Sequence, residues 1–401
     1  MKRGDNHMCA DRSYHFLFFG LTSFTSLPQR EQAIAIECAR LGHTVDFIEI
    51  APSIAGKAHA LFNRVFSPLS RDSGFTFDVE IPNLRIHTPP TLPTGFRNSM
   101  TPALDRAIFR RWFRRRFEGV DFSQVIAMVM MPLWWNNYID RELFDPGLLV
   151  YDICDSLEVQ SRNDDTLRRL REAEAALGAE AGLITFSARE METEVRSKFP
   201  HAEALFLPNA VSRGFIERVD REPLFHRNGH PRSIGYIGAT SGKWFDTELV
   251  LATIRECADC HVAIIGPVDK RFAAACARYP NVTLHGYVSH DLLAAHLRRF
   301  DVAIIPFLDN EITRLVNPLK LYEYSVAGLP IVATRTAELA HHASLMYLAH
   351  DTQSFVASIR EALSEDSPER RQERRSFAET HTWEDRVHAF IGHLRAQVLA
   401  A

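Results

Sequence analysis

The sequence alternates between short apolar strands and helical segments, and this order constrains the fold more than any other feature. Tyr14–Gly20 is a continuous apolar run that ends in glycine, a helical pattern follows from about Pro28 to Leu41, and Thr44–Ile50 has the pattern of a second strand. Pro28 suits the first turn of a helix and Gly42 its end. A strand, helix, strand order of this kind begins a parallel, doubly wound α/β sheet.

The same alternation continues and then starts again in the second half of the chain. The further strands expected in the first half are Leu84–Thr88, Val125–Met131, Leu148–Ile153, Gly182–Phe186 and Leu205–Asn209. A polar, charged segment at 217–232 is interpreted as hinge and linker. The strands expected after it are Ser233–Ile237, Val262–Ile265, Val282–His285, Asp301–Pro306 and Pro330–Ala333.

Chain length agrees with two domains, because 401 residues exceed the roughly 100–200 of a typical domain. We predict an N-terminal Rossmann-like domain over 1–212, a second one over 213–375, and a C-terminal helix at 376–401 that packs back toward the first. The fold class is therefore α/β, with two doubly wound domains facing across a cleft. Ligands of such sheets lie at the carboxyl ends of the strands, so the loops there are the first place to seek chemistry.

Composition excludes several classes of protein. Apolar residues make up 46% and charged residues 24%, which is typical of a globular chain. The longest apolar runs fall far short of the roughly 20 residues of a membrane helix, and no signal segment is evident, so a cytoplasmic protein is expected. A formal charge of -4 argues against a globally basic nucleic-acid binder, and no nucleic-acid partner is expected.

The six cysteines are expected to be reduced thiols, because their spacing is irregular. Cys257-Ala258-Asp259-Cys260-His261 matches the pattern for covalent haem attachment, but that chemistry requires export, and no second Cys/His pair is spaced to complete a zinc site. No Asp-x-Asp occurs in the sequence, so the usual carboxylate pair for a metal bridge to a diphosphate is missing. We therefore predict no cofactor and no metal.

The loop after the expected strand Asp301–Pro306 is the richest in functional groups. It leads into a helix that Pro318 would open, with Lys320 in the first turn and Glu323 about one turn in. A helix N-terminus beside a lysine suits a diphosphate, and a carboxylate can accept hydrogen bonds from two ribose hydroxyls. The alternative is that Lys320 and Glu323 form an ordinary surface pair at i,i+3.

A glycine-bearing loop follows the first strand of the second domain, at Gly235–Gly242, and would let the backbone approach phosphates. Its spacing is not the dinucleotide fingerprint, and no acidic residue ends a strand about 20 residues later. An oxidoreductase therefore ranks below an enzyme that uses a nucleotide sugar.

Asp155 follows the expected strand Leu148–Ile153, which places it at the cleft. A carboxylate there can take the proton from an acceptor hydroxyl, and Asp155 is the candidate catalytic base. The alternative is a turn or capping residue ahead of the helix expected around Leu167–Ala176.

The segment Asp105–Phe117 contains six arginines and four aromatic residues in one expected helix. Such a helix either lies on an anionic membrane surface, or turns its aromatic residues into the core. In the first interpretation the membrane contacts are Arg110, Arg111, Trp112, Arg114 and Arg115.

Several segments together resemble the group 1, family 4-like glycosyltransferases of GT-B fold, of the bacterial polysaccharide or glycolipid type. The resemblance rests on Asn317–Tyr324 with Ala327–Thr334, on Gly238-Ala239 through Asp246, on Ile265–Val268, on Leu207–Val211, on Gln29-Arg30 and on His381–Val387. It covers most of the chain, is strong in the C-terminal half and is diffuse between about 52 and 147.

The resemblance implies a hexosyltransferase-type enzyme with a nucleotide-diphosphate sugar as donor and a saccharide or lipid-linked saccharide as acceptor. Glu323 would bind the ribose, Lys320 and Lys243 would reach toward the diphosphate, and Arg30 would lie on the acceptor side. The donor site would include Gly238, Gly266, Asn317 and Pro318. Peripheral attachment to the inner face of the membrane would follow from lipid-linked acceptors.

One position departs from the family pattern. Many relatives carry a glutamate eight residues before the ribose carboxylate, where it helps to position the sugar, but here that residue is Leu315. Glu311 lies nearby and is a candidate substitute. Two other functions stay open: a nucleotide-sugar epimerase of the same fold, and a GT-B scaffold or binding subunit without catalysis.

Overall fold

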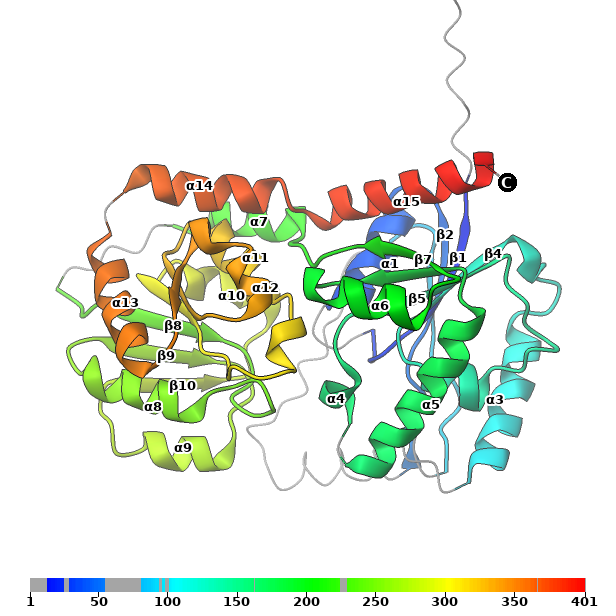
Figure 1. Ribbon diagram of the computed structural model, residues 1–401, viewed down its shortest axis with the longest axis horizontal. Coiled ribbons are helices and arrows are strands. Elements are labelled where there is room, and N and C mark those ends of the chain that lie inside the picture. The colour runs from blue at the N-terminus through cyan, green and yellow to red at the C-terminus, as the bar shows by residue number, and fades with distance from the viewer. Residues whose placement is uncertain are drawn as a thin grey trace, which may run out of the picture.

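The structure, a computed structural model, describes residues 13–24, 29–54, 81–93, 96–97, 101–161, 163–223, 229–365 and 367–400. Two parallel sheets form two lobes that lie side by side (Figure 1). The expected helix start at Pro28 lies outside the described residues, and the helix is described from Arg30.

The N-terminal lobe is built on a seven-stranded parallel sheet of order β3-β2-β1-β4-β5-β6-β7. Its strands are β1 His15–Phe19, β2 Thr44–Ile48, β3 Leu84–His87, β4 Val125–Val129, β5 Leu148–Ile153, β6 Leu183–Phe186 and β7 Glu203–Phe206. Its helices are α1 Arg30–Arg40, α3 Pro102–Arg116, α4 Leu157–Gln160, α5 Asp164–Glu180 and α6 Glu192–Lys198, with short turns η1 Phe122–Gln124, η2 Trp134–Tyr138 and η3 Arg189–Met191.

The C-terminal lobe is built on a six-stranded parallel sheet of order β10-β9-β8-β11-β12-β13. Its strands are β8 Ser233–Ile237, β9 His261–Ile265, β10 Val282–Gly286, β11 Val302–Ile305, β12 Ile331–Thr334 and β13 Tyr347–Ala349. Its helices are α7 Arg213–Arg221, α8 Thr247–Glu256, α9 Lys270–Cys276, α10 His290–Leu297, α11 Leu319–Val326, α12 Ala337–Ala340, α13 Thr352–Ser364 and α14 Pro368–Glu379, with turns η4 Thr313–Leu315 and η5 Ala343–Leu345. The predicted pair of doubly wound α/β domains is confirmed.

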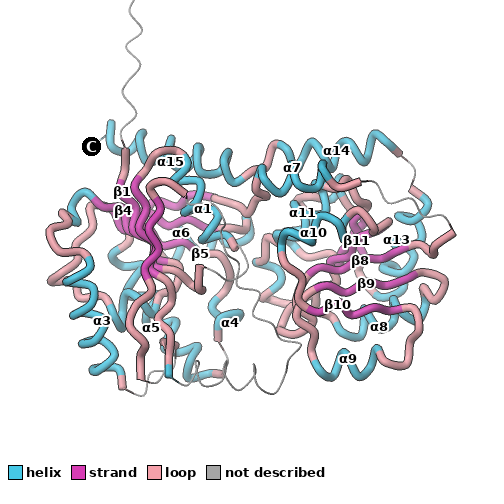
Figure 2. The backbone as a smooth tube through the Cα atoms, turned by 180° about the vertical axis from the view of Figure 1, so that it is seen from behind, coloured by secondary structure: helices cyan, strands magenta, loops and turns pink. Residues whose placement is uncertain are grey.

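Each sheet is covered by helices on both faces, which explains why its strands are apolar throughout rather than alternating. In β1, Phe16 and Phe18 pack toward α1, whereas Leu17 and Phe19 pack on the opposite face toward α3. All four side chains are buried. Figure 2 shows the two sheets from behind, each enclosed within its own lobe.

The last helix, α15 (Trp383–Ala400), packs on the N-terminal lobe (Figure 1). Trp383, Val387 and Phe390 are buried in the same core as α1. An isolated bridge pairs Val211 with Thr382 just before the helix begins. The two places where the chain passes between the lobes, near Val211 and near Thr382, therefore lie side by side.

The linker prediction over 217–232 is wrong for its first part, because α7 extends to Arg221. Phe215, Ile216 and Val219 are buried in the core of the C-terminal lobe, with the charged residues of α7 on its outer face. The polar composition reflects one face of an amphipathic helix, which a composition argument does not distinguish from a linker. Residues 224–228 lie outside the described part of the chain.

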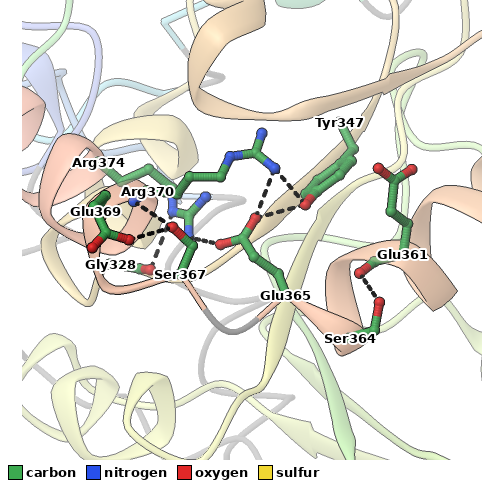
Figure 3. Close-up of polar contacts among 9 residues, drawn as sticks. All are labelled: Gly328, Tyr347, Glu361, Ser364, Glu365, Ser367, Glu369, Arg370 and Arg374. Atoms are coloured by element: carbon green, nitrogen blue, oxygen red, sulfur yellow. Dashed lines mark hydrogen bonds and ion pairs between the residues drawn. The ribbon is translucent and has the colours of Figure 1, made fainter.

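The junction of α13 and α14 is fixed by a buried polar group (Figure 3). Glu365 accepts a hydrogen bond from the Tyr347 hydroxyl at 2.6 Å and forms ion pairs with Arg370 and with the buried Arg374. Arg374 Nε also donates to the carbonyl of Gly328 at 3.1 Å. This group anchors α14, which leads directly to the crossing into α15.

Candidate active site

Asp155 lies two residues after the end of β5, at the carboxyl end of the N-terminal sheet. It lines two hollows at once. One is small, about 70 Å³, and is also lined by Arg30, Glu31, Asp152 and Leu319. The other is about 450 Å³ and lies between the lobes. Asp155 therefore stands at the point where ligands from the two sides of the cleft would meet.

Burial raises the pKa of Asp155 to about 6, while Arg30 and Lys320 pull it in the opposite direction. A carboxyl group with this pKa is still ionised at neutral pH and is a stronger base than an exposed aspartate. The helix-cap alternative is not what the structure shows for α5, because Asn163 caps that helix by accepting from the Thr166 N–H. Ser156 occupies the N-cap position of α4.

Lys320 and Glu323 both lie on α11. Burial lowers the pKa of Lys320, while Glu323 and Asp155 counteract that effect. Burial also raises the pKa of Glu323, with Lys320 opposing it. The pair is thus not the solvated surface pair of the simpler interpretation. It is an incompletely hydrated cation and carboxylate, and Lys320 also interacts electrostatically with Asp155.

Gly238, at the end of β8, gives Lys320 the space that it occupies. A Cβ at this glycine would lie 2.7 Å from Lys320 Cε, and its φ of 150° is unfavourable for other residues. Lys320 Nζ lies 5.6 Å from the ring centre of Tyr236 and 5.8 Å from that of Phe307, within cation–π range. The lysine is therefore held against the β8 loop at the N-terminus of α11, whose N-cap position is Pro318.

Gly266 packs closely against the backbone of this loop at Gly238. A Cβ at Gly266 would lie 2.4 Å from the Gly238 carbonyl oxygen, and the Gly238 N–H donates to Ile265 O at 2.7 Å. The structure shows that Gly266 leaves room for the backbone of Gly238. Its role in donor binding stays a prediction.

Asn317 lies between the two lobes. It is 3% exposed; its side-chain oxygen accepts from the Asn209 N–H at 3.2 Å, and its Nδ2 donates to Glu338 at 2.9 Å. Glu338 also accepts the backbone N–H of Arg189 in the N-terminal lobe, at 2.8 Å. In this structure the side chain of Asn317 is engaged in joining the lobes, while its backbone precedes α11.

The sequence predicts donor contacts for Lys243 and Glu311, but the partners of these two side chains lie elsewhere in the cleft. Lys243 Nζ donates across the cleft to the Glu158 carbonyl at 3.1 Å. Glu311 is an exposed residue that pairs with Arg314 and lines the larger cavity. Leu315, at the position of the family glutamate, lines that cavity too and packs with the core of the N-terminal lobe. The donor contacts of Lys243 and Glu311 stay predictions.

Arg30 is buried and makes a two-bond ion pair with Asp152, at 2.8 and 2.7 Å. Its Nη1 also reaches Asn209 Oδ1 at 3.4 Å. Arg30 lines the small hollow, as an acceptor-side residue would, but its strongest contacts are with the protein. Asp152 was missed in the sequence because nothing in its spacing marks it as the partner of Arg30.

Glu31 is a second residue that the sequence did not indicate. It accepts hydrogen bonds from the backbone N–H groups of Leu21 and Thr22 and from the Thr22 hydroxyl. Burial raises the pKa of Glu31 to about 7, against these hydrogen bonds. Glu49 holds the next part of the same loop through Ser23 and Phe24. Two carboxylates thus fix the β1–α1 loop at the edge of the cleft.

The arginine-rich helix α3 turns its phenylalanines into the protein. Phe109 and Phe113 are buried in the core, and Trp112 is partly buried against it. Arg110 pairs with Asp140 at 2.6 Å, so it is not a freely exposed cation. Arg111, Arg114 and Arg115 are exposed. No helix in the described part of the chain is long and apolar enough to cross a bilayer.

Within the described ranges, no three His, Cys, Asp or Glu side chains are grouped so that they could hold a metal ion. Cys257 and Cys260 of the haem-like pattern are buried in the C-terminal core. Burial raises the pKa of both thiols. They act there as small core residues.

Comparison with known proteins finds similar sequences among glycosyltransferases. Residues 231–365 match the family model described as glycosyl transferases group 1. A Bacillus subtilis (strain 168) protein named as a teichuronic acid biosynthesis glycosyltransferase, TuaH, is 25% identical over 262 residues. That match spans 60% of this chain and 65% of the relative, which is less than two thirds of its length.

Solved structures show the same architecture over nearly the whole chain. Sucrose-phosphate synthase from Thermosynechococcus elongatus aligns with a TM-score of 0.66 at 14% identity, covering 97% of this chain and 100% of that one. Anabaena HepE, solved with UDP and glucose, aligns with a TM-score of 0.67 at 11% identity, covering 96% and 100%. At these identities the likeness shows the fold.

The two-lobed fold and the matched second domain together define a GT-B protein, as the sequence predicted. Within that class, residues 231–365 are similar to the group 1 glycosyl transferases.

Proposed function

We propose that the protein is a glycosyltransferase that moves a hexose from a nucleotide-diphosphate sugar to an acceptor hydroxyl. The observation that carries this proposal is the position of Asp155 in the N-terminal lobe, which lines one hollow together with Leu319, the first residue of α11 in the C-terminal lobe, and also lines the cavity between the lobes. Lys320, the next residue of α11, and Asp155 influence each other's pKa, which supports a base and a cation for a leaving diphosphate on the two lobes. This is what a displacement at an anomeric carbon between them requires.

The donor would bind to the C-terminal lobe. Lys320 and the first amides of α11 would neutralise the diphosphate, Gly238 would let it approach the backbone, and Glu323 would accept the ribose hydroxyls. These groups are cationic or dipolar, so the proposal needs no metal ion. HepE binds UDP, which makes uridine nucleotides the first donors to test.

Asp155 would act as the base. The acceptor oxygen bonds to the anomeric carbon as the bond from that carbon to the diphosphate breaks, and the acceptor proton passes to Asp155. In a retaining reaction the departing phosphate would take this proton instead, and an Asp155→Asn variant distinguishes the two routes. Closure of the lobes would exclude water and limit hydrolysis of the donor.

The acceptor would be a saccharide or lipid-linked saccharide, and the pathway would be synthesis of a cell-surface polysaccharide or glycolipid. The name of the Bacillus subtilis relative supports the polysaccharide assignment. The exposed arginines of α3 support transient attachment to an anionic membrane face by charge alone, because the aromatic residues of that helix are used in the core.

A thermal-shift screen with UDP, GDP, TDP and their common sugar conjugates, with and without EDTA, tests the proposal. A ligand at 100 times its Kd adds about 2.7 kcal/mol of stability, a shift of a few degrees. Stabilisation by one nucleotide family, insensitive to EDTA, is the expected result. Product analysis with donor alone then separates transfer from epimerisation, and stabilisation by none of the nucleotides contradicts the donor site.

A further inference from the structure

The larger of the two cavities that Asp155 lines combines carboxylates with apolar side chains. It measures about 450 Å³, within the roughly 300–1,000 Å³ of small-molecule sites. One wall comes from β5, α4, α5 and α6 of the N-terminal lobe, and the facing wall from residues 311–315 of the C-terminal lobe. Asp155 is among its lining residues, so the proposed base borders the cavity directly.

Every cation that lines this cavity is already paired with a carboxylate. Arg171 pairs with Glu158, at 2.8 Å. Lys198 pairs with Glu174. Arg314 pairs with Glu311, at 3.1 Å. Two further carboxylates, Asp155 and Glu194, line the cavity as well, so five carboxylates stand against three cations.

Among the described residues, the lining of this cavity therefore carries excess negative charge and offers a phosphate or carboxylate ligand no unpaired cation. Bringing an anion into this space would add repulsion from the excess carboxylates, and would cost desolvation without a compensating ion pair from the lining.

Apart from Ser156, the remaining lining is apolar. Leu157, Met191, Val195 and Phe199 are buried side chains on the N-terminal wall, and Leu315 with Ile312 forms the opposite wall. Leu315 contributes a hydrocarbon surface where a carboxylate would otherwise be available for sugar hydroxyls. Apolar walls of this kind bind ligands by removing hydrocarbon surface from water.

We propose that this cavity, the cavity between α6 and residues 311–315, receives an uncharged apolar group of the acceptor and excludes anionic groups. The group is a hydrocarbon or aromatic substituent joined to the sugar or alcohol whose hydroxyl reaches Asp155. The proposal rests on the proposed glycosyltransferase function, and it names the chemical class of the acceptor next to the reacting hydroxyl.

The test is a titration calorimetry series with methyl, butyl and hexyl glucoside, below micelle formation, on the full chain saturated with UDP. Each added CH₂ is expected to tighten binding by about threefold to fourfold. Hexyl glucoside 6-phosphate is expected to bind at least tenfold more weakly than hexyl glucoside.

Two variants on opposite walls, Val195→Asn and Ile312→Asn, are expected to flatten the dependence on chain length. Val356→Asn, a half-buried valine on α13 in the C-terminal lobe, is the matched control and should leave it unchanged. Thermal unfolding confirms that each variant is folded, and Ile312→Asn keeps the test valid if Val195→Asn is not.

The possible failures are distinct. Affinity that is independent of chain length in the unmodified protein overturns the cavity assignment, as does a chain-length dependence that survives in both folded cavity variants or tight binding of the phosphate. UDP titrated alone reports on the donor site. Failure to bind any nucleotide in the thermal-shift screen overturns the proposed function, and the acceptor assignment with it.

Discussion

The guanidinium of Arg30 donates from Nε and Nη2 to the two carboxylate oxygens of Asp152, at 2.8 and 2.7 Å, in the floor of the cleft. Neither residue has more than 5% of its surface exposed. The pair joins the first turn of α1 to β5 across 122 positions of the sequence. It fixes α1 against the strand that ends beside Asp155.

Replacing Asp152 with alanine leaves the Arg30 charge buried without its partner and is expected to cost about 3–5 kcal/mol of unfolding free energy. Urea denaturation followed by circular dichroism measures this change. The double variant Arg30→Met with Asp152→Leu removes both charges and should be less destabilised than Asp152→Ala. A double variant that is the less stable of the two would show that the pair is not a coupled unit.

Glu323→Ala is expected to weaken binding of the preferred nucleotide at least tenfold, because it removes a charge-assisted hydrogen-bond acceptor worth roughly 1.5–3 kcal/mol. Isothermal titration measures the affinity. Glu256→Ala, an exposed residue of α8, is the control for a change of charge alone. Equal nucleotide affinity in the two variants would remove Glu323 from the donor site.

Asp155 predicts a pH dependence of both activity and stability. Because its pKa is raised to about 6, kcat/KM should fall about tenfold for each pH unit below 6, as the base becomes protonated. Asp155→Asn should abolish this limb together with most of the activity. A rate that persists in Asp155→Asn would instead indicate that the leaving phosphate takes the proton.

The same raised pKa means that the ionised Asp155 destabilises the fold, a cost present above the folded pKa and absent below the unfolded value near 3.9. Asp155→Asn is therefore expected to increase unfolding free energy at pH 7.5 by up to about 3 kcal/mol, with the gain shrinking toward pH 4. Urea titrations at several pH values measure it, and a gain that does not change with pH would contradict the assignment.

The ionised Asp46 contributes to stability with the opposite sign, because its pKa is lowered. Burial alone would raise the pKa of its carboxyl, but hydrogen bonds from His15, His87 and Arg85 outweigh burial and hold the pKa well below its usual range. Its stabilising contribution is present above the unfolded pKa near 3.9 and is lost as pH falls through the folded value. Asp46→Asn should cost about 1–3 kcal/mol at pH 7 and progressively less at low pH.

Membrane attachment through α3 is tested with vesicles that contain phosphatidylglycerol. Combined replacement of Arg111, Arg114 and Arg115 by glutamine should lower binding by roughly 100-fold, at about 1 kcal/mol per arginine. The control replaces three exposed arginines on other helices, Arg196, Arg221 and Arg255. Equal binding of the two triple variants would reject α3 as the contact.

Much of the architecture could be predicted because the apolar runs of the strands are continuous. Strand β5 and strand β8 have the predicted bounds, since most of their residues are apolar and are buried between helices, and the charged Asp152 of β5 is paired with Arg30. The linker prediction failed because α7 has charged residues on one face only, whereas composition averages over both faces of a helix. Glu31 and Asp152 were missed because their partners are brought to them by the sheet.

The order of residues along the chain was enough to predict the two α/β series and to put Asp155, Lys320, Glu323 and Gly238 near strand and helix ends. Such positions depend on local order, which the residues along the chain encode. The packing of distant segments, in contrast, brings Asp155 into one hollow with Leu319 of α11 and makes Asn317 join the lobes. It also decided that the cations around Leu315 are already paired, because charge and hydration depend on neighbours that are distant in the chain.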